Sequence, residues 1–133
     1  MDFKRITLTL TGTAAWTREY EVKKTLMGME AALYEGGWKY NKMESRASCR
    51  KGHGSWGKSE YKSFSEKLDK LGVKSWGGFS KSNPNVLDGD SFSLEIELAD
   101  GKMMYAHGCN SYPKNYHEFE KMLDEAVFGP KEY

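Results

Sequence analysis

The fold is decided by the stretch SFSLEIELADGKMMYAHGCNSYPKNYHEFEKMLDEAVF, residues 91–128. Its first eight residues alternate apolar and polar side chains, and this period of two places the apolar side chains on one face of a strand. The Asp100-Gly101 pair that follows favours the tight turn of a hairpin, and residues 103–107 return as a second strand. We therefore predict a β-hairpin over the first half of this stretch.

A helix is predicted to follow the hairpin. Pro113 and Asn115 precede it, and Asn115 with Glu118 has the spacing of a capping box. Apolar residues then recur at three- and four-residue spacing, which is typical of a helix that packs one face against a core. The residues of this face are Tyr116, Phe119, Met122, Leu123, Ala126 and Val127.

Similar patterns predict the elements that precede the hairpin. Alternation indicates strands over residues 4–11 and 16–26, and residues 27–35 fit either a strand or a short helix, of which the flanking glycines favour the strand. A helix is predicted over residues 59–71, with Ser59 as its N-cap and Gly72 at its C-terminal end. We thus expect a single α+β domain over residues 1–133, an antiparallel β-sheet with two helices packed on one face, in the order β-β-β-α-β-β-α.

Composition narrows the setting of this domain. The chain has 133 residues, 18 of them aromatic, so we expect one aromatic-rich core. No long apolar run and no signal-peptide pattern occurs, so we expect a cytoplasmic protein with no membrane partner. The net charge of +1 divides into +6 for residues 1–75 and −5 for residues 76–133. If the two halves form different faces, the protein has two faces of opposite charge, and the alternative is that folding mixes the charges.

The C-terminal third resembles small, mostly uncharacterised bacterial proteins, especially those of Gram-positive bacteria and their mobile elements. The resemblance covers residues 88–128 and rests on the segment DGDSFSLEI at 88–96, on DGK at 100–102 and on GCNSYP at 108–113, followed by the helix. It implies a hairpin that packs against a C-terminal helix, and it brings no activity with it. Gly108 and Asn110 tolerate a positive φ, and Pro113 fixes the backbone before the helix, which agrees with this layout.

Cysteine and histidine residues provide one class of functional hypothesis. Two thiolates and two imidazoles are a ligand set for a tetrahedral zinc ion, and a cysteine beside a histidine is the arrangement for nucleophilic catalysis with His53, His107 or His117 as base. No catalytic motif accompanies them, so we predict no cofactor and regard a zinc protein or a small enzyme as an alternative. The candidate metal-ligating residues are Cys49, His53, His107 and Cys109.

An irregular basic and aromatic loop is predicted over residues 38–58, with a short strand near 43–49 as an alternative. Its cations can bind phosphates and its rings can stack on bases or pack against a protein. We expect a non-enzymatic interaction module for a protein or nucleoprotein partner, and the resemblance to mobile-element proteins suggests an inhibitor of a host nucleoprotein. Direct binding of single-stranded nucleic acid is the alternative. The candidate binding residues are Trp38, Lys39, Tyr40, Lys42, Arg46, Arg50, Lys51, Trp56 and Lys58.

Overall fold

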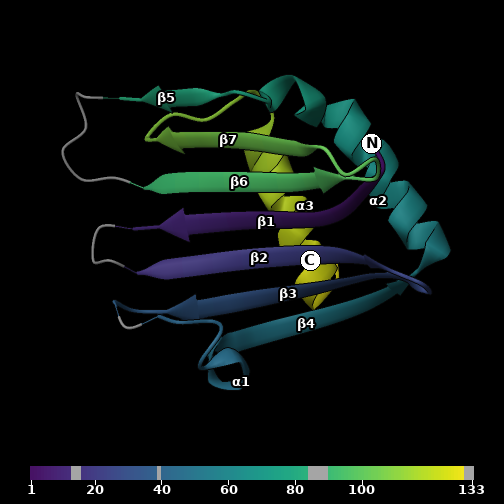
Figure 1. Ribbon diagram of the computed structural model, residues 1–133, viewed down its shortest axis with the longest axis horizontal. Helices are drawn as coiled ribbons and strands as arrows, with labels where there is room; N and C mark the ends of the chain where they lie inside the picture. The colour runs from purple at the N-terminus through teal and green to yellow at the C-terminus, as the bar shows by residue number, and fades with distance from the viewer. Residues whose placement is uncertain (13–15, 39, 84–89, 131–133) are drawn as a thin grey trace.

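The computed structural model describes residues 1–12, 16–38, 40–83 and 90–130. Within these residues, seven strands form one sheet in the order β4-β3-β2-β1-β6-β7-β5 (Figure 1). Neighbouring strands are antiparallel except β5 and β7, which are parallel. The elements are β1 (Phe3–Thr11), β2 (Thr17–Thr25), β3 (Gly28–Gly36), α1 (Arg46–Cys49), β4 (Arg50–Gly57), α2 (Lys58–Leu71), η1 (Val73–Trp76), β5 (Ser80–Ser82), β6 (Ser91–Leu98), β7 (Met103–Cys109) and α3 (Tyr116–Phe128).

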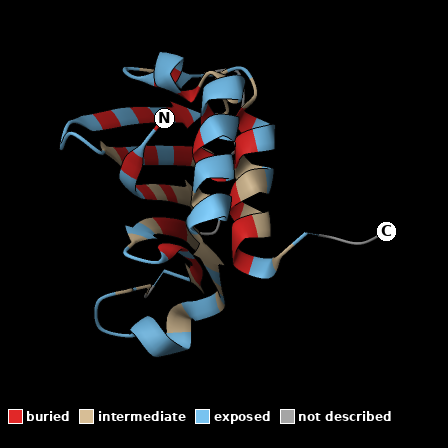
Figure 2. Cartoon of the chain, turned by 90° about the vertical axis from the view of Figure 1, so that its right-hand side faces the viewer, coloured by how far each residue is buried: buried red, intermediate tan, exposed pale blue. Residues whose placement is uncertain are grey.

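Helices α2 and α3 lie on the same face of the sheet and enclose the core (Figure 2). Leu8, Leu94 and Phe119 are fully buried between these two layers. The core is rich in aromatic rings, as predicted: the Phe92 ring centroid lies 4.8 Å from that of Tyr116 and 5.5 Å from that of Tyr112. The α+β class and the two-layer arrangement are therefore confirmed. No helix in the described part of the chain has the length and the apolar run needed to span a membrane.

The predicted hairpin is β6 and β7. Phe92, Leu94 and Ile96 alternate as buried residues with exposed polar ones, and Gly101 in the turn has φ +90°. Asn110 has the positive φ expected of it, +55°, whereas Gly108 is needed because a Cβ there would lie 2.1 Å from the backbone oxygen of Ser111. Asp88 and Gly89, which contribute to the resemblance, lie outside the described residues.

The predicted order β-β-β-α-β-β-α and the all-antiparallel sheet are wrong in part. The order lacks α1, β4 and β5, and β5 pairs with β7 in parallel. The loop predicted over residues 38–58, and the alternative strand near 43–49, give way from Arg46 onward to α1 and β4. Strand β4 carries Gly52 and Gly54 where α3 packs on its backbone, since a Cβ on Gly54 would lie 2.0 Å from the Ala126 carbonyl oxygen. The strand therefore lacks the apolar alternation by which strands are recognised.

Both predicted helix caps are also corrected. Helix α2 begins after Gly57, with no side-chain cap, and Ser59 lies inside it. Asn115 is the N-cap residue of α3 but adopts the left-handed conformation, and its Nδ2 donates a hydrogen bond to the Leu71 carbonyl oxygen at 3.1 Å. The side chain of Asn115 thus ties α3 to the end of α2 and does not form a capping box. The left-handed Gly72 at the end of α2 is confirmed.

Candidate functional site

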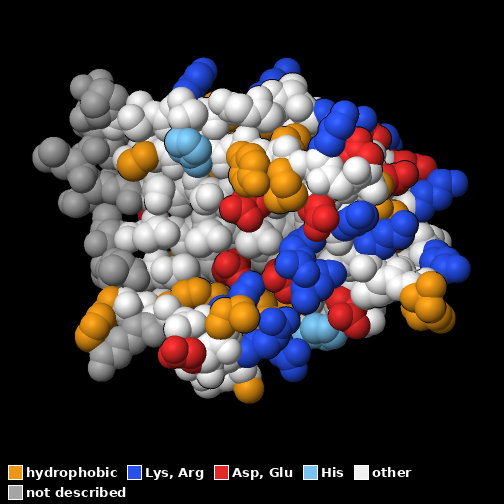
Figure 3. Space-filling model, viewed as in Figure 1, with side chains coloured by type: hydrophobic (Ala, Val, Ile, Leu, Met, Phe, Trp, Pro, Cys, Tyr) orange, Lys and Arg blue, Asp and Glu red, His pale blue; other side chains and the backbone are white. Residues whose placement is uncertain are grey.

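The face of the sheet opposite α2 and α3, which we call the open face, carries side chains toward solvent (Figure 3). On β1, β6 and β7 these are the alternate residues to those buried against the helices. They form a polar surface with hydrophobic and acidic side chains over β6 and β7, of which Tyr105 is 54% exposed. The outward residues of these strands are Arg5, Thr7, Thr9, Thr11, Ser91, Ser93, Glu95, Glu97, Met103, Tyr105, His107 and Cys109.

Residues 40–46, which we call the cover segment, close the open face over β2 and β3. Tyr34 and Ala32 are outward residues of β3, yet they are only 1% and 7% exposed. The Lys42 ammonium and the Arg46 guanidinium lie 5.2 and 5.3 Å from the centroid of the Tyr34 ring. Two cations over one aromatic face shield it from water and gain cation–π stabilisation.

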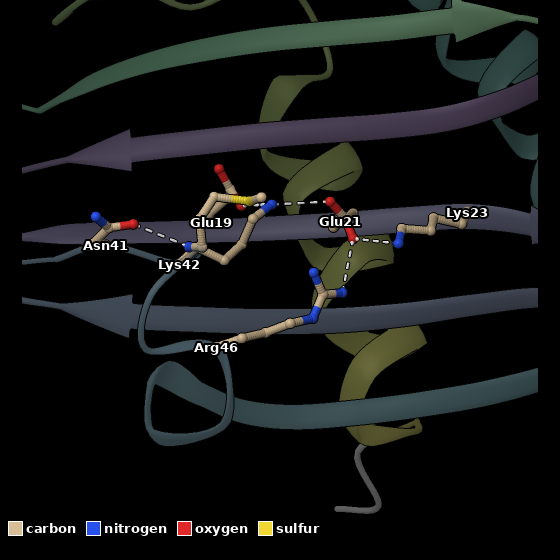
Figure 4. A network of polar contacts seen from close by, with 7 residues as sticks. Glu19, Glu21, Lys23, Asn41, Lys42 and Arg46 are labelled. Carbon is tan, nitrogen blue, oxygen red and sulfur yellow. Dashed lines mark hydrogen bonds and ion pairs between the residues drawn. The ribbon is translucent and has the colours of Figure 1, made fainter.

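An ion-pair cluster of Glu19, Glu21, Lys23, Lys42 and Arg46 fixes the cover segment to β2 (Figure 4). Lys42 Nζ lies 2.5 Å from Glu19 Oε2 and 3.0 Å from Glu21 Oε2. Lys23 Nζ and Arg46 Nη2 approach the other oxygen of Glu21 at 3.2 and 3.7 Å. The cluster therefore joins two strand glutamates to cations from two separate parts of the chain.

Glu21 is the buried member of this cluster, only 6% exposed. Burial raises the pKa of its carboxyl, but hydrogen bonds and charge from Lys42 and Lys23 outweigh burial, so that the pKa lies below its usual value. For Lys42, burial lowers the pKa of the ammonium, and Glu19 with Glu21 more than reverses this and raises it. Both groups are held in their charged forms at neutral pH.

The tip of the cover segment presents apolar side chains to solvent. Asn41 Oδ1 accepts hydrogen bonds from the backbone N–H groups of Met43 at 3.1 Å and Glu44 at 3.2 Å, which forms a local turn. Met43 is 84% exposed, and Trp38, just before the segment, is 78% exposed. The segment thus directs its cations inward to the sheet and displays large apolar groups outward.

The remaining predicted binding residues divide between framework and surface. Tyr40 packs on Gly36, where a Cβ would lie 2.8 Å from its ring, and the indole Nε1 of Trp56 donates a hydrogen bond to the Ala126 carbonyl oxygen at 2.7 Å. Both are placed by the fold. Arg50 and Lys51 are exposed on β4, and Lys58 is exposed at the start of α2. Lys39 lies outside the described residues.

The candidate metal-ligating residues are not brought together. Cys49 and His53 belong to α1 and β4, whereas His107 and Cys109 lie on β7. Strands β4 and β7 are separated by β3, β2, β1 and β6, so that five strand spacings of about 4.8 Å place them roughly 24 Å apart. A zinc ion binds its ligands at about 2.0–2.3 Å. The described residues contain no group of three or more His, Cys, Asp and Glu placed to hold a metal ion.

Sequence reasoning missed the acidic partners of the basic segment. Glu19 and Glu21 belong to the strand predicted over residues 16–26, but their ion pairs with Lys42 and Arg46 were not predicted. Two glutamates two positions apart lie on one face of a strand, and together with the local excess of Lys and Arg they are the signal that could have indicated this cluster. On the other face, Arg18 Nε pairs with Glu35 at 3.0 Å.

Comparison with known proteins finds no family model, no curated protein and no solved structure that matches this chain. The resemblance of residues 88–128 to small bacterial proteins therefore stays a prediction. The described residues leave the tip of the cover segment, the open face and strand β4 accessible to solvent.

Proposed function

We propose that this protein is a non-enzymatic binding module that recognises a protein partner through Trp38 and the tip of the cover segment, residues 40–46. The observation that carries the proposal is the division of roles within these residues. Lys42 and Arg46 are engaged by Glu19 and Glu21, while large apolar side chains remain at the surface. Exposed aromatic and methionine side chains on a held backbone suit a protein interface, where such residues contribute most of the binding free energy.

The same ion pairs weigh against direct binding of single-stranded nucleic acid. Binding to a phosphate backbone depends on Lys and Arg that can exchange counterions for phosphates. Glu19 and Glu21 already neutralise Lys42, and a nucleic acid would have to displace two carboxylates at 2.5 and 3.0 Å from its ammonium. A protein partner can use the apolar tip with this cluster intact.

The distance between the two Cys/His pairs supports a binding function over a zinc-dependent one, and the surroundings of Cys109 bear on a cysteine-dependent one. Catalysis by a thiol requires a base within hydrogen-bond reach and a third group that orients the base. Among the described residues, the hydrogen bond recorded at the Cys109 thiol comes from Asn110 Nδ2 at 3.8 Å and not from a histidine. Inhibition of a host nucleoprotein, the specialisation suggested by the resemblance, stays a prediction.

The proposal is tested by affinity capture with the wild-type chain and with a variant that carries Trp38→Ser and Met43→Ser. We expect the variant to capture at least ten-fold less of a partner protein that the wild type captures, because two exposed apolar side chains are removed. The matched control carries Leu26→Ser and Met27→Ser at the β2–β3 turn, where the side chains are 87% and 74% exposed. Equal capture by all three proteins, at equal thermal stability, would refute this recognition surface.

A further inference from the structure

Strand β4 forms one edge of the sheet and is eight residues long. Within the described residues it pairs with β3 alone, and Figure 1 shows no strand beyond it. Every second residue of an edge strand directs its N–H and C=O groups away from the sheet, where a further strand can bind them. The opposite edge, β5, has only three residues, whereas β4 is in regular register with β3 from Gly52 to Gly57 and has a register shift at Arg50 and Lys51.

The helix side of this edge is apolar where the end of α3 covers it. Gly52 and Gly54 carry no side chains, and the end of α3 lies over them: a Cβ on Gly52 would lie 2.5 Å from the Phe128 ring. The Phe128 side chain is 53% exposed and overhangs the strand. Further along the same side, a pocket of about 180 Å³ between α2 and α3 is lined by Trp56 and Met122 together with the charged residues Glu60, Lys67 and Glu125. A side chain that projects over Gly52 and Gly54 from an added strand meets the apolar end of α3.

The open side of the same edge is basic. Lys51 and His53 alternate with the glycines and are exposed. Arg46 and Arg50 line a small hollow of about 90 Å³ together with His53. The acids at this hollow are Glu21, which is already paired with three cations, and Glu30 on β3. No acidic residue occurs in residues 50–58.

We propose that β4 binds an extended segment of a partner protein in which acidic and apolar residues alternate, added as an eighth strand. Because side chains of a strand alternate between its two sides, one set meets Lys51 and His53 while the other meets Phe128 and Trp56. A second copy of this chain is the poorer occupant, because residues 50–58 contain no acidic residue that could meet Lys51 and His53 across a β4–β4 pair. This inference rests on the proposed function as a protein-binding module and names the class of segment it takes.

The test is selection of displayed random eight-residue peptides on the full chain. We expect enriched peptides to alternate acidic and apolar residues, and the tightest synthetic peptide to bind at least ten-fold more weakly to a Lys51→Glu variant. The matched control, Lys102→Glu at the β6–β7 turn, should change the affinity less than two-fold, because Lys102 is 81% exposed and remote from β4. Circular dichroism verifies that both variants fold.

Backbone pairing is tested by N-methylation of the selected peptide. The amide groups of the bound peptide alternate between facing β4 and facing away from it. Methylation of the set that faces β4 should abolish binding. Methylation of the other set should change the affinity by less than about three-fold. Selection that yields no peptide or no acidic alternation, or equal effects of both methylation sets, would overturn the inference. The inference would also be overturned if sedimentation showed that the wild-type chain is a dimer and that Lys51→Glu dissociates it. None of these results affects capture through Trp38 and Met43, so failure here is distinct from failure of the proposed function.

Discussion

Replacement of Lys42 by alanine tests the ion-pair cluster directly. The substitution leaves Glu21, whose side chain is 7% exposed, without its closest cation and removes the ammonium between the two glutamates. Breaking a fully buried pair costs about 3–5 kcal/mol, and an exposed pair about 0.2–1 kcal/mol. The Lys42 side chain is 17% exposed, and Lys23 and Arg46 still compensate Glu21. We therefore expect the free energy of unfolding to fall by about 2 kcal/mol.

Urea unfolding at pH 7, followed by tryptophan fluorescence, measures this loss. With a slope of about 2 kcal/mol per molar urea, the midpoint should fall by roughly 1 M. Lys42→Met keeps an unbranched apolar side chain but removes the ammonium near the Tyr34 ring, and it should lose a similar amount, which separates charge from packing. The control is Lys102→Ala, whose ion pair with Asp100 spans 4.0 Å between exposed side chains, with an expected loss below about 0.5 kcal/mol. A Lys42→Ala loss as small as that of the control would refute the cluster as the anchor of the cover segment.

Three further outcomes are expected. The pKa of the Glu21 carboxyl in the folded protein lies below its unfolded value of 4.5. Its contribution to stability is therefore present above pH 4.5 and is lost as the pH falls through the folded-state pKa. In acid titration, the Glu21→Gln variant should show a shallower loss of stability below pH 4.5 than the wild type. Gly54→Ala places a Cβ 2.0 Å from the Ala126 carbonyl oxygen and should cost about 3 kcal/mol or more in urea unfolding, whereas Gly37→Ala, with no atom within 4 Å, should change stability by less than about 0.5 kcal/mol. Leu94→Ala, at a position with 0% exposure, should cost about 3–4 kcal/mol by the same measurement, and a loss under about 1 kcal/mol would contradict its place in the core.

Alternation and helical spacing predicted the elements whose burial depends on side chains. Leu94 and Ile96 on β6 are fully buried, and so are Phe119 and Leu123 on α3. In these elements the apolar side chains themselves mark the face that meets the core, so the sequence pattern and the burial pattern coincide. Strand β3 was also correctly preferred to a helix, because Gly28 and the glycines after it leave too short a segment.

Strands β4 and β5 could not be predicted by the same means. Two inward positions of β4 are Gly52 and Gly54, and α3 packs directly on their backbone. Because these positions carry no side chain, the sequence shows no apolar residue there that would mark a buried strand. Strand β5 is exposed along its whole length and is held by backbone hydrogen bonds, such as His107 N–H to the Phe79 carbonyl oxygen at 2.9 Å. Backbone pairing of this kind has no residue signature.

The candidate site was predicted in composition but not in arrangement. The basic and aromatic character of the segment around Lys42 was evident, yet its hydrogen bond to Glu21 joins residues 21 positions apart. Local sequence patterns indicate contacts only between residues a few positions apart. These charges are brought together by the pairing of β2 with β3, which depends on the tertiary structure. The expected free cations are for this reason partly neutralised.

The central place of β1 in the sheet governs the order in which the molecule can assemble. Leu8 lies opposite Tyr20 of β2 and also opposite Leu94 of β6, more than eighty residues later. Closing the longer loop costs about 1.7 kcal/mol more in chain entropy than closing the shorter one. Synthesis at about 5–20 residues per second separates the two partners, Tyr20 and Leu94, by roughly 4–15 seconds. During that interval one side of β1 has no partner, so the half-sheet β1 to β4 passes through a period in which mispairing competes with the arrival of β6.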